Sequence, residues 1–155
     1  MIRISSALFN GAVATGIQCS SKAAVLAKIS ALAAKTYGLD AAMILDGLEE
    51  RERLGTTGFG GGTAIPHCKV PGIDAPVGVF LRLAKAVDYD AVDDEPVDLI
   101  FGLISPAHDG ALHLRSLAEV SRMLRDEKSC VQIRGAGDAD ALFALLTLNE
   151  ERDAA

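Results

Sequence analysis

Apolar residues recur at helical spacing in the first third of the chain. Ser20 or Ser21 can cap a helix that runs to about Tyr37 and is followed by a glycine. Asp40 can cap a second helix, which closes on the charged segment 49–53. The apolar faces comprise Leu26, Ile29, Ala33 and Tyr37 in the first helix and Ala41, Ile44, Leu45 and Leu48 in the second. The pattern therefore predicts two helices joined by a short turn.

The middle of the chain has the pattern of buried strands. Segments 77–83 and 97–104 are rich in β-branched, leucine and aromatic residues and are bounded by proline, aspartate and glycine. After the turn-rich segment 105–110, the periodicity predicts a helix with His113 in its first turn. Its expected apolar face consists of Leu114, Leu117, Ser121 and Leu124. Helices around central strands predict a layered α/β fold.

The C-terminal part is less regular. A last helix is predicted over 139–146, while the pattern of segment 130–134 is ambiguous. The polar tail 150–155 is expected to be frayed.

Composition limits the classes of function. The 155 residues are 50% hydrophobic, which suits a single domain over 1–155 with its core at about 17–146. No apolar run is long enough to cross a bilayer and no secretory signal is recognisable, so we expect a cytoplasmic protein without membrane insertion. The net charge of −6 disfavours a nucleic-acid partner. Three scattered cysteines, without a CxxC pair, are expected to be free thiols.

The segment between Arg51 and His67 carries the candidate chemistry. Glycines let backbone amides approach an anion closely, threonines add hydroxyl donors, and Pro66 fixes the backbone just before His67. A neutral imidazole offers an unprotonated nitrogen that can accept a phosphoryl group and later release it. We therefore expect a phosphate-accepting pocket at His67, cradled by Thr56, Thr57, Gly58, Gly60 and Gly62.

Other ligands fit this segment poorly. The glycine run lacks the Lys-Ser/Thr ending of a P-loop and does not have the spacing of a dinucleotide-binding turn, so no cofactor is expected. Zinc would have to recruit His67, Cys68, His108 and His113, which lack HxxxH or CxxC spacing, so no metal is expected either.

Several short motifs follow one another along the chain in an order and spacing typical of one protein family. Gly-Thr-Thr-Gly-x-Gly-x-Gly at 55–62, Ala-Ile-Pro-His at 64–67, the acidic segment 90–101 and the pair His113-Leu114 resemble the enzyme IIA domains of the fructose/mannitol class of the phosphoenolpyruvate-dependent phosphotransferase system. The likeness is closest to the nitrogen-regulatory branch and covers about 17–146. It implies the type-2 enzyme IIA fold, with a mixed β-sheet flanked by helices.

The resemblance also assigns roles to three residues. It implies that His67 is the phosphoacceptor, through Nε2, and that His113 lies beside it and bonds a phosphoryl oxygen or sets the proton position. Arg51 would grip phosphate oxygens with its planar guanidinium. Glu52 and Arg53 are expected to be surface charges, and His108 a solvated loop residue.

Two features of the loop remain open. Cys68 stands where the family commonly has glycine, and its thiol would narrow the pocket or sense oxidation if exposed; an inert thiol is the favoured interpretation. Phe59, Ile65 and Val70 fit an apolar rim of the site and ordinary core packing equally well.

The favoured function is that of a phosphorelay protein, a phosphocarrier rather than a free-standing turnover enzyme. His67 would accept a phosphoryl group from an HPr-like phosphocarrier, and its phosphorylation state would regulate nitrogen- or potassium-related targets, such as a potassium transporter or a sensor kinase. One alternative is a sugar-uptake component that passes phosphate to a IIB domain. Another is a regulatory binding module that is never phosphorylated.

Overall fold

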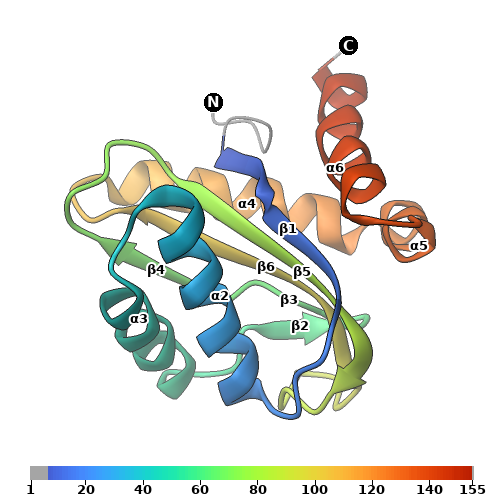
Figure 1. Cartoon of the computed structure of the whole chain (residues 1–155), viewed down its shortest axis with the longest axis horizontal. Coiled ribbons are helices and arrows are strands. Elements are labelled where there is room, and N and C mark those ends of the chain that lie inside the picture. Colours follow the sequence, from blue (N-terminus) through green and yellow to red (C-terminus); the bar gives the residue numbers. More distant parts are fainter. Residues whose placement is uncertain (1–6, 155) are drawn as a thin grey trace.

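One mixed sheet organises the molecule (Figure 1). The computed structural model describes residues 7–154. The strands are β1 (Leu8–Ile17), β2 (Gly58–Gly60), β3 (Thr63–Ala64), β4 (His67–Val70), β5 (Val77–Val87) and β6 (Val97–Pro106). Their order is β1-β5-β6-β3-β2, and β4 pairs with β6 farther along that strand. Because β5 and β6 are antiparallel while β1, β3 and β4 pair in parallel, the mixed sheet expected from the sequence is confirmed.

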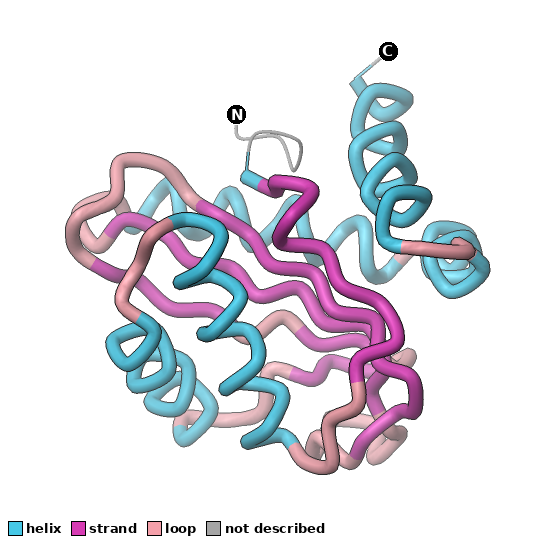
Figure 2. The backbone as a smooth tube through the Cα atoms, in the orientation of Figure 1, coloured by secondary structure: helices cyan, strands magenta, loops and turns pink. Residues whose placement is uncertain are grey.

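Helices cover both faces of this sheet (Figure 2). The helices are α2 (Lys22–Tyr37), α3 (Ala41–Arg53), α4 (Gly110–Arg125), α5 (Glu127–Gly135) and α6 (Ala139–Ala154). In Figure 1, α2 and α3 lie in front of the sheet and α4 crosses behind it, while α5 and α6 lie to one side. The arrangement confirms the layered α/β class.

The predicted helix caps are confirmed. The Ser21 side chain accepts a hydrogen bond from Ala24 N at 3.1 Å, and Gly38 ends α2 in the left-handed region at φ 70°. The Asp40 carboxylate accepts from the amides of Ala42 and Met43 at the start of α3. These caps mark the ends of the two helices because each satisfies backbone groups that the helix leaves unpaired.

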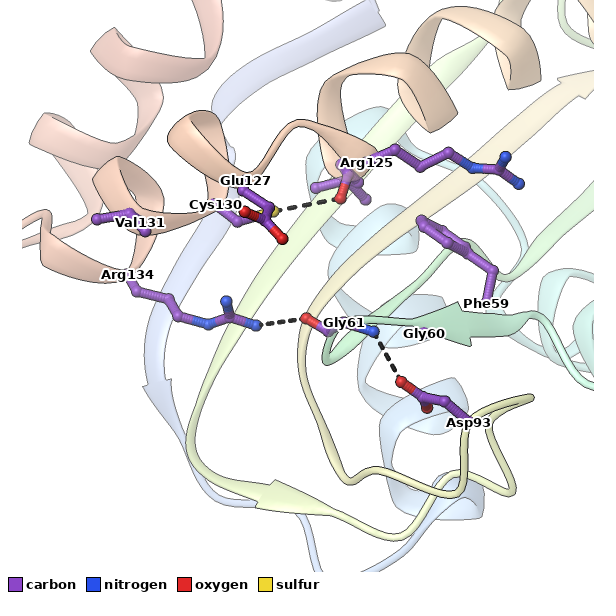
Figure 3. A pocket seen from close by; sticks show the side chains of 10 residues that line it. Phe59, Gly60, Gly61, Asp93, Arg125, Glu127, Cys130, Val131 and Arg134 are labelled. Atoms are coloured by element: carbon purple, nitrogen blue, oxygen red, sulfur yellow. Dashed lines mark hydrogen bonds between the residues drawn. The ribbon is translucent and has the colours of Figure 1, made fainter.

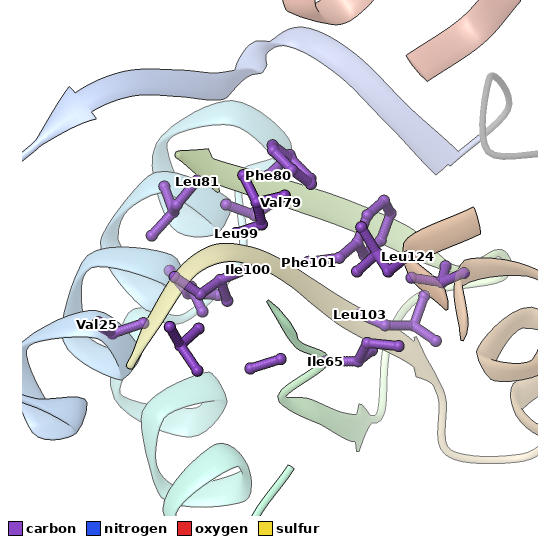
Figure 4. Packing of buried hydrophobic residues seen from close by; sticks show 14 of the residues in the cluster. Val25, Ile65, Val79, Phe80, Leu81, Leu99, Ile100, Phe101, Leu103 and Leu124 are labelled. Carbon is purple, nitrogen blue, oxygen red and sulfur yellow. The ribbon is translucent and has the colours of Figure 1, made fainter. Parts of the chain in front are cut away.

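The core lies between the sheet and the helices (Figure 4). Phe80 on β5 and Phe101 on β6 are directly paired and pack edge to face, with ring centroids 6.3 Å apart. On the α3 side, Ile44 and Leu48 are fully buried. Under α3, the Cys68 side chain of β4 lies against Gly47, where an added Cβ would be 2.9 Å from the Cβ of Cys68. Helix and strand are therefore in backbone-close contact at this point.

Strand β1 was not predicted. Its sequence contains Asn10, Gly11 and Gly16 and few β-branched residues, so its local preference for a strand is weak. Its register against β5 is interrupted between Leu8 and Val13 and again before Ile17. The strand is therefore held mainly by its long-range pairing with β5, which no local pattern reveals.

The remaining differences lie toward the C-terminus. The ambiguous segment 130–134 belongs to α5, and α6 continues to Ala154, beyond the predicted end at Leu146. The side chain of Arg82 on β5 donates to the Ile133 carbonyl at 2.9 Å, which adds a long-range hydrogen bond to the C-terminal end of α5.

The buried face of α4 is rotated relative to the prediction. Leu114 was expected to face the core but is 67% exposed, whereas His113 and Ser116 are buried with Val120 and Leu124. His113 can face inward because its Nδ1 is hydrogen-bonded to Ser105 on β6, and Ser116 because its hydroxyl donates to the Leu112 carbonyl of the same helix. Hydrophobicity alone cannot reveal such a pairing.

Candidate active site at the edge of the sheet

His67 begins β4, the strand that pairs with β6 at this edge of the sheet. The amide of Leu103 on β6 donates to the Pro66 carbonyl at 3.0 Å, which fixes the backbone just before the imidazole. Along β4 the side chains alternate, so Cys68 and Val70 are buried while His67 is half-buried and Lys69 exposed. His67 therefore stands on the side of the strand that solvent and partners can reach.

The hydrogen bonds of His67 define its tautomer. Nδ1 lies 2.8 Å from the Ile65 carbonyl oxygen, which only accepts, so Nδ1 carries the proton. Nε2 accepts a hydrogen bond from Arg51 Nε at 3.2 Å and therefore holds the lone pair. Nε2 is therefore the ring nitrogen with the lone pair that a nucleophile needs, and its phosphorylation stays a prediction.

The surroundings of His67 favour its neutral form. Burial lowers the pKa of His67 below its ordinary value, and the nearby Arg51 guanidinium lowers it further. The Ile65 carbonyl and the Glu52 carboxylate act in the opposite direction but more weakly than burial. A neutral imidazole with a free electron pair is the form that can attack phosphorus.

His113 lies beside His67, as the sequence predicted. It stands in the first turn of α4, whose start is capped by Asp109 through the Leu112 amide at 3.0 Å. The two imidazole centroids are 5.3 Å apart. His113 is buried, and its Nδ1 lies 2.6 Å from the hydroxyl of Ser105 at the end of β6. Burial, and the proximity of His67 and Lys69, lower the pKa of His113 to about 4.

Arg51 reaches His67 from the other side. It lies in the last turn of α3, where its Nη1 donates to the Gly55 carbonyl at 2.8 Å while Nε donates to His67. Its remaining N–H groups bind no other residue among those described. A guanidinium held in this way can offer donors to a phosphoryl group on Nε2.

Glu52 is not a surface charge, and that expectation is wrong. Its side chain is 7% exposed and accepts from Lys22 Nζ at 3.1 Å, from Tyr89 Oη at 3.2 Å, and from both the amide and the hydroxyl of Thr57. The sequence did contain a signal. Ile44, Leu48 and Glu52 recur every four residues and therefore share the buried face of α3.

Residues 55–57, the near end of the glycine segment, belong to the hydrogen-bond network around Arg51 and Glu52. The Thr56 hydroxyl donates to the Tyr89 carbonyl at 3.2 Å and accepts from the Gly58 amide at 3.1 Å. Thr57 is buried, and both its amide and its hydroxyl bind Glu52. In this structure these threonines therefore hold the loop together rather than leave their donors open to solvent.

Residues 60–62, the far end of the glycine segment, lie away from His67. The Gly62 carbonyl accepts from Leu99 N, whereas His67 pairs with Leu103, so the two are four residues, or about 13 Å, apart along β6. Gly60 and Gly61 line a separate hollow of about 670 Å³ beside α5 (Figure 3). There Gly61 donates to Asp93 and accepts from Arg134, each at 3.0 Å. The structure thus brings Arg51 and His113 to His67 but places Gly60 and Gly62 away from it.

The apolar residues of the loop, which fitted either a rim of the site or the core, pack mainly into the fold. Ile65 and Val70 are buried in the core, and Phe59 is half-buried under the Arg125 guanidinium, 5.2 Å from its ring centroid. The apolar residues that are exposed next to site residues in the chain are Leu54 and Leu114.

Cys68 is an inert thiol by its surroundings. It is 7% exposed beneath α3, on the opposite side of β4 from the imidazole of His67, and burial raises its pKa to about 12. Cys19, Cys68 and Cys130 are all free thiols, as expected. His108 lies exposed in the turn before α4, also as expected.

Neither a candidate metal site nor a helix able to cross a membrane is found within residues 7–154. No three histidine, cysteine or acidic side chains in that range are gathered so that they could hold a metal ion. No helix in the same range is both long enough and apolar enough to cross a membrane.

The fold and the histidine site together define a class. The chain belongs to the EIIA 2 family of the phosphoenolpyruvate-dependent sugar phosphotransferase system, whose family model matches residues 7–149. Membership of this family gives the chain a role in phosphorelay or in regulation by it.

Within the family, the chain is similar to nitrogen regulatory proteins. It is 38% identical to the nitrogen regulatory protein of Bradyrhizobium diazoefficiens over 137 residues, which are 88% of this chain and 90% of that protein. It is 36% identical to the nitrogen regulatory protein of Escherichia coli K12 over 150 residues, 96% of this chain and 92% of that one. The crystal structure of nitrogen regulatory protein IIA-Ntr from Neisseria meningitidis matches with a TM-score of 0.82 at 30% identity, covering 93% of this chain and 99% of that chain.

Proposed function

We propose that His67 is a reversible phosphoryl acceptor whose donor is the phosphohistidine of a small HPr-like carrier protein. The observation that carries the proposal is the pair of hydrogen bonds on His67, because they leave the electron pair on Nε2 and point an arginine at the same atom. Phosphoryl transfer asks a protein mainly for alignment and for charge stabilisation. Ile65, Arg51 and His113 supply groups suited to both tasks.

The transfer step balances without a further reactant. The Nε2 electron pair forms a bond to phosphorus while the N–P bond of the donor phosphohistidine breaks and returns its electron pair to the donor ring. The acceptor ring becomes more positive, and the Ile65 carbonyl stabilises that charge through the proton on Nδ1. Arg51 and His113 face the negative phosphoryl oxygens.

The same modification would serve as a switch in the cytoplasm. A phosphoryl group adds about 1.5 to 2 negative charges to a surface where Leu54 and Leu114 are exposed close in sequence to Arg51 and His113. Partners that bind this surface would therefore distinguish the two forms. Because the relatives are named nitrogen regulatory proteins, we propose regulatory targets in nitrogen or potassium homeostasis, including a potassium transporter or a sensor kinase.

Intact-mass measurement tests the proposal. The protein is incubated with phosphoenolpyruvate, enzyme I and an HPr-like carrier that is active on another IIA protein. We expect one acid-labile phosphate on the wild type and on His108→Ala, because His108 is an exposed turn residue outside the site, and none on His67→Ala.

Two outcomes would contradict the proposal. Normal labelling of folded His67→Ala would move the phosphoacceptor to another residue. No added mass on the wild type would favour a binding module that is never phosphorylated.

A further inference from the structure

Ser105 makes an unusual contact for a residue of the central sheet. It lies near the end of β6, is fully buried at 0% exposure, and places its hydroxyl 2.6 Å from Nδ1 of His113. Among the described residues, His113 is the only hydrogen-bond partner of this hydroxyl. The contact therefore joins a candidate active-site ring to a rigid strand.

The direction of this hydrogen bond follows from the donor and acceptor inventory. A serine hydroxyl has one proton to donate and two lone pairs, and a buried donor without an acceptor is more costly than an unused lone pair. If His113 Nδ1 carried the proton, the Ser105 proton would be buried with no described acceptor. The favoured arrangement is that Ser105 donates to Nδ1 and that the ring proton of His113 is on Nε2.

The two histidines then have opposite tautomers. The Ile65 carbonyl, a pure acceptor, keeps the proton of His67 on Nδ1 and leaves Nε2 bare. The Ser105 hydroxyl, acting as a donor, leaves Nδ1 of His113 bare and keeps the proton on Nε2. One ring thus presents an electron pair and its neighbour, 5.3 Å away between centroids, presents an N–H.

We propose that Ser105 is a positioning residue that holds His113 in the Nε2–H tautomer, so that His113 offers a donor rather than a lone pair to the phosphoryl group on His67. The part that concerns the phosphoryl group rests on the proposed function, whereas the tautomer does not. An unprotonated Nε2 on His113 would repel the negative oxygens of the phosphoryl group instead of donating to them, and the serine prevents that arrangement.

Nitrogen NMR of the histidine rings tests the tautomer directly. In unphosphorylated wild-type protein labelled with ¹⁵N-histidine at neutral pH, we expect His113 to show a protonated Nε2 and a bare Nδ1, and His67 the reverse. In Ser105→Ala, the Nδ1 resonance of His113 should move toward that of a nitrogen without a hydrogen bond, and Ser105→Thr should move it back. A wild-type His113 with its proton on Nδ1 would overturn the proposal, whether or not any variant folds.

Transfer kinetics test the consequence. Because Ser105 is fully buried, it lies off any surface that the carrier could contact. Ser105→Ala should therefore lower kcat for phosphoryl transfer from the carrier roughly three- to tenfold and leave KM unchanged, as the loss of one hydrogen bond predicts. Ser105→Thr should recover most of the rate. Ser30→Ala is the matched control, since Ser30 is equally buried but donates to the Leu26 carbonyl inside α2.

A double-mutant cycle separates positioning from a general structural effect. In a His113→Ala background, Ser105→Ala should have no further effect on kcat, because its target ring is gone. Additive losses would show that Ser105 acts by another route and would overturn the proposal. If His67 accepts no phosphate at all, the proposed function fails, while the NMR result still decides the tautomer.

Discussion

The two ends of the glycine segment are close in sequence but do different things. At residues 55–57 the backbone is held by α3, since Gly55 binds Arg51 and Thr57 binds Glu52, next to the imidazole of His67. At Gly61 the backbone is held by Asp93 and by Arg134 of α5, beside a separate hollow (Figure 3).

The difference shows what glycines do in this loop. The near end ties the loop to the helix that carries Arg51, whereas the far end uses left-handed glycines to make a turn that is fastened by charged side chains. The near end should therefore matter for phosphoryl transfer as well as for stability, and the far end for stability alone.

Arg51 and Arg134 provide the largest expected contrast. Arg51→Ala removes the donor to Nε2 of His67 and should lower kcat/KM for phosphoryl transfer about a hundredfold, a typical result of losing one preorganised donor. Arg134→Ala breaks the pair with Asp98 at 2.8 Å but touches nothing at His67, so transfer should stay close to wild type. The measurement is the rate of label transfer from the carrier. An equal loss in both variants would show that the two ends act together.

Glu52→Gln tests the anchor of the near end. The substitution keeps the shape but removes the charge that pairs with Lys22 and accepts from Thr57 and Tyr89, so urea unfolding should show a loss of about 2 kcal/mol. Glu49→Gln on the same helix is the control, because the Glu49–Arg53 pair is exposed and should contribute less than about 0.5 kcal/mol. Indistinguishable unfolding midpoints for the two variants would contradict the role of Glu52.

Gly62→Ala tests the far end. Gly62 has φ 77°, and an added Cβ would lie 2.6 Å from Arg134 Nη2, so we expect a loss of about 2 kcal/mol in the free energy of unfolding. Gly61→Ala is the comparison, since Gly61 has φ 68° but open space around it, and the cost should be nearer 1 kcal/mol. Both variants should transfer phosphate normally. Slow transfer in either one would place the far end in the active site after all.

The pH dependence of stability gives the smallest effect. The pKa of His113 is about 4 in the folded protein and near its ordinary value when unfolded, so below pH 6.5 the unfolded chain binds a proton that the folded chain does not. Stability should therefore fall as the pH is lowered. Between pH 6.5 and 5.5 the wild type should lose about 1 kcal/mol more than His113→Gln, measured by urea unfolding at each pH. Parallel pH profiles would show that His113 does not contribute.

Sequence reasoning succeeded where the information is local. The caps at Ser21 and Asp40 were predicted because each side chain satisfies amides only two or three residues away. The position of Arg51 beside the glycine segment and of His113 beside His67 came from motif order rather than from periodicity.

It failed where the partner belongs to another element of the fold. Strand β1 depends on β5, and the burial of Glu52 depends on Lys22 and Tyr89, which are 30 and 37 residues away. The inward turn of His113 depends on Ser105, a residue that no motif marked. Polar groups that satisfy each other inside the fold cannot be recognised from hydrophobicity, which counts each of them as a surface residue.

The close contact of Gly47 with Cys68 means that only one of these two positions can carry a side chain. There is room for one Cβ substituent at the place where α3 crosses β4, and in this chain the strand occupies it. The reverse arrangement, with alanine at 47 and glycine at 68, fills the same space from the helix side. We expect Gly47→Ala and Cys68→Gly to be tolerated together, and Gly47→Ala alone to destabilise the fold. The residue that follows His67 is therefore coupled to position 47 of α3.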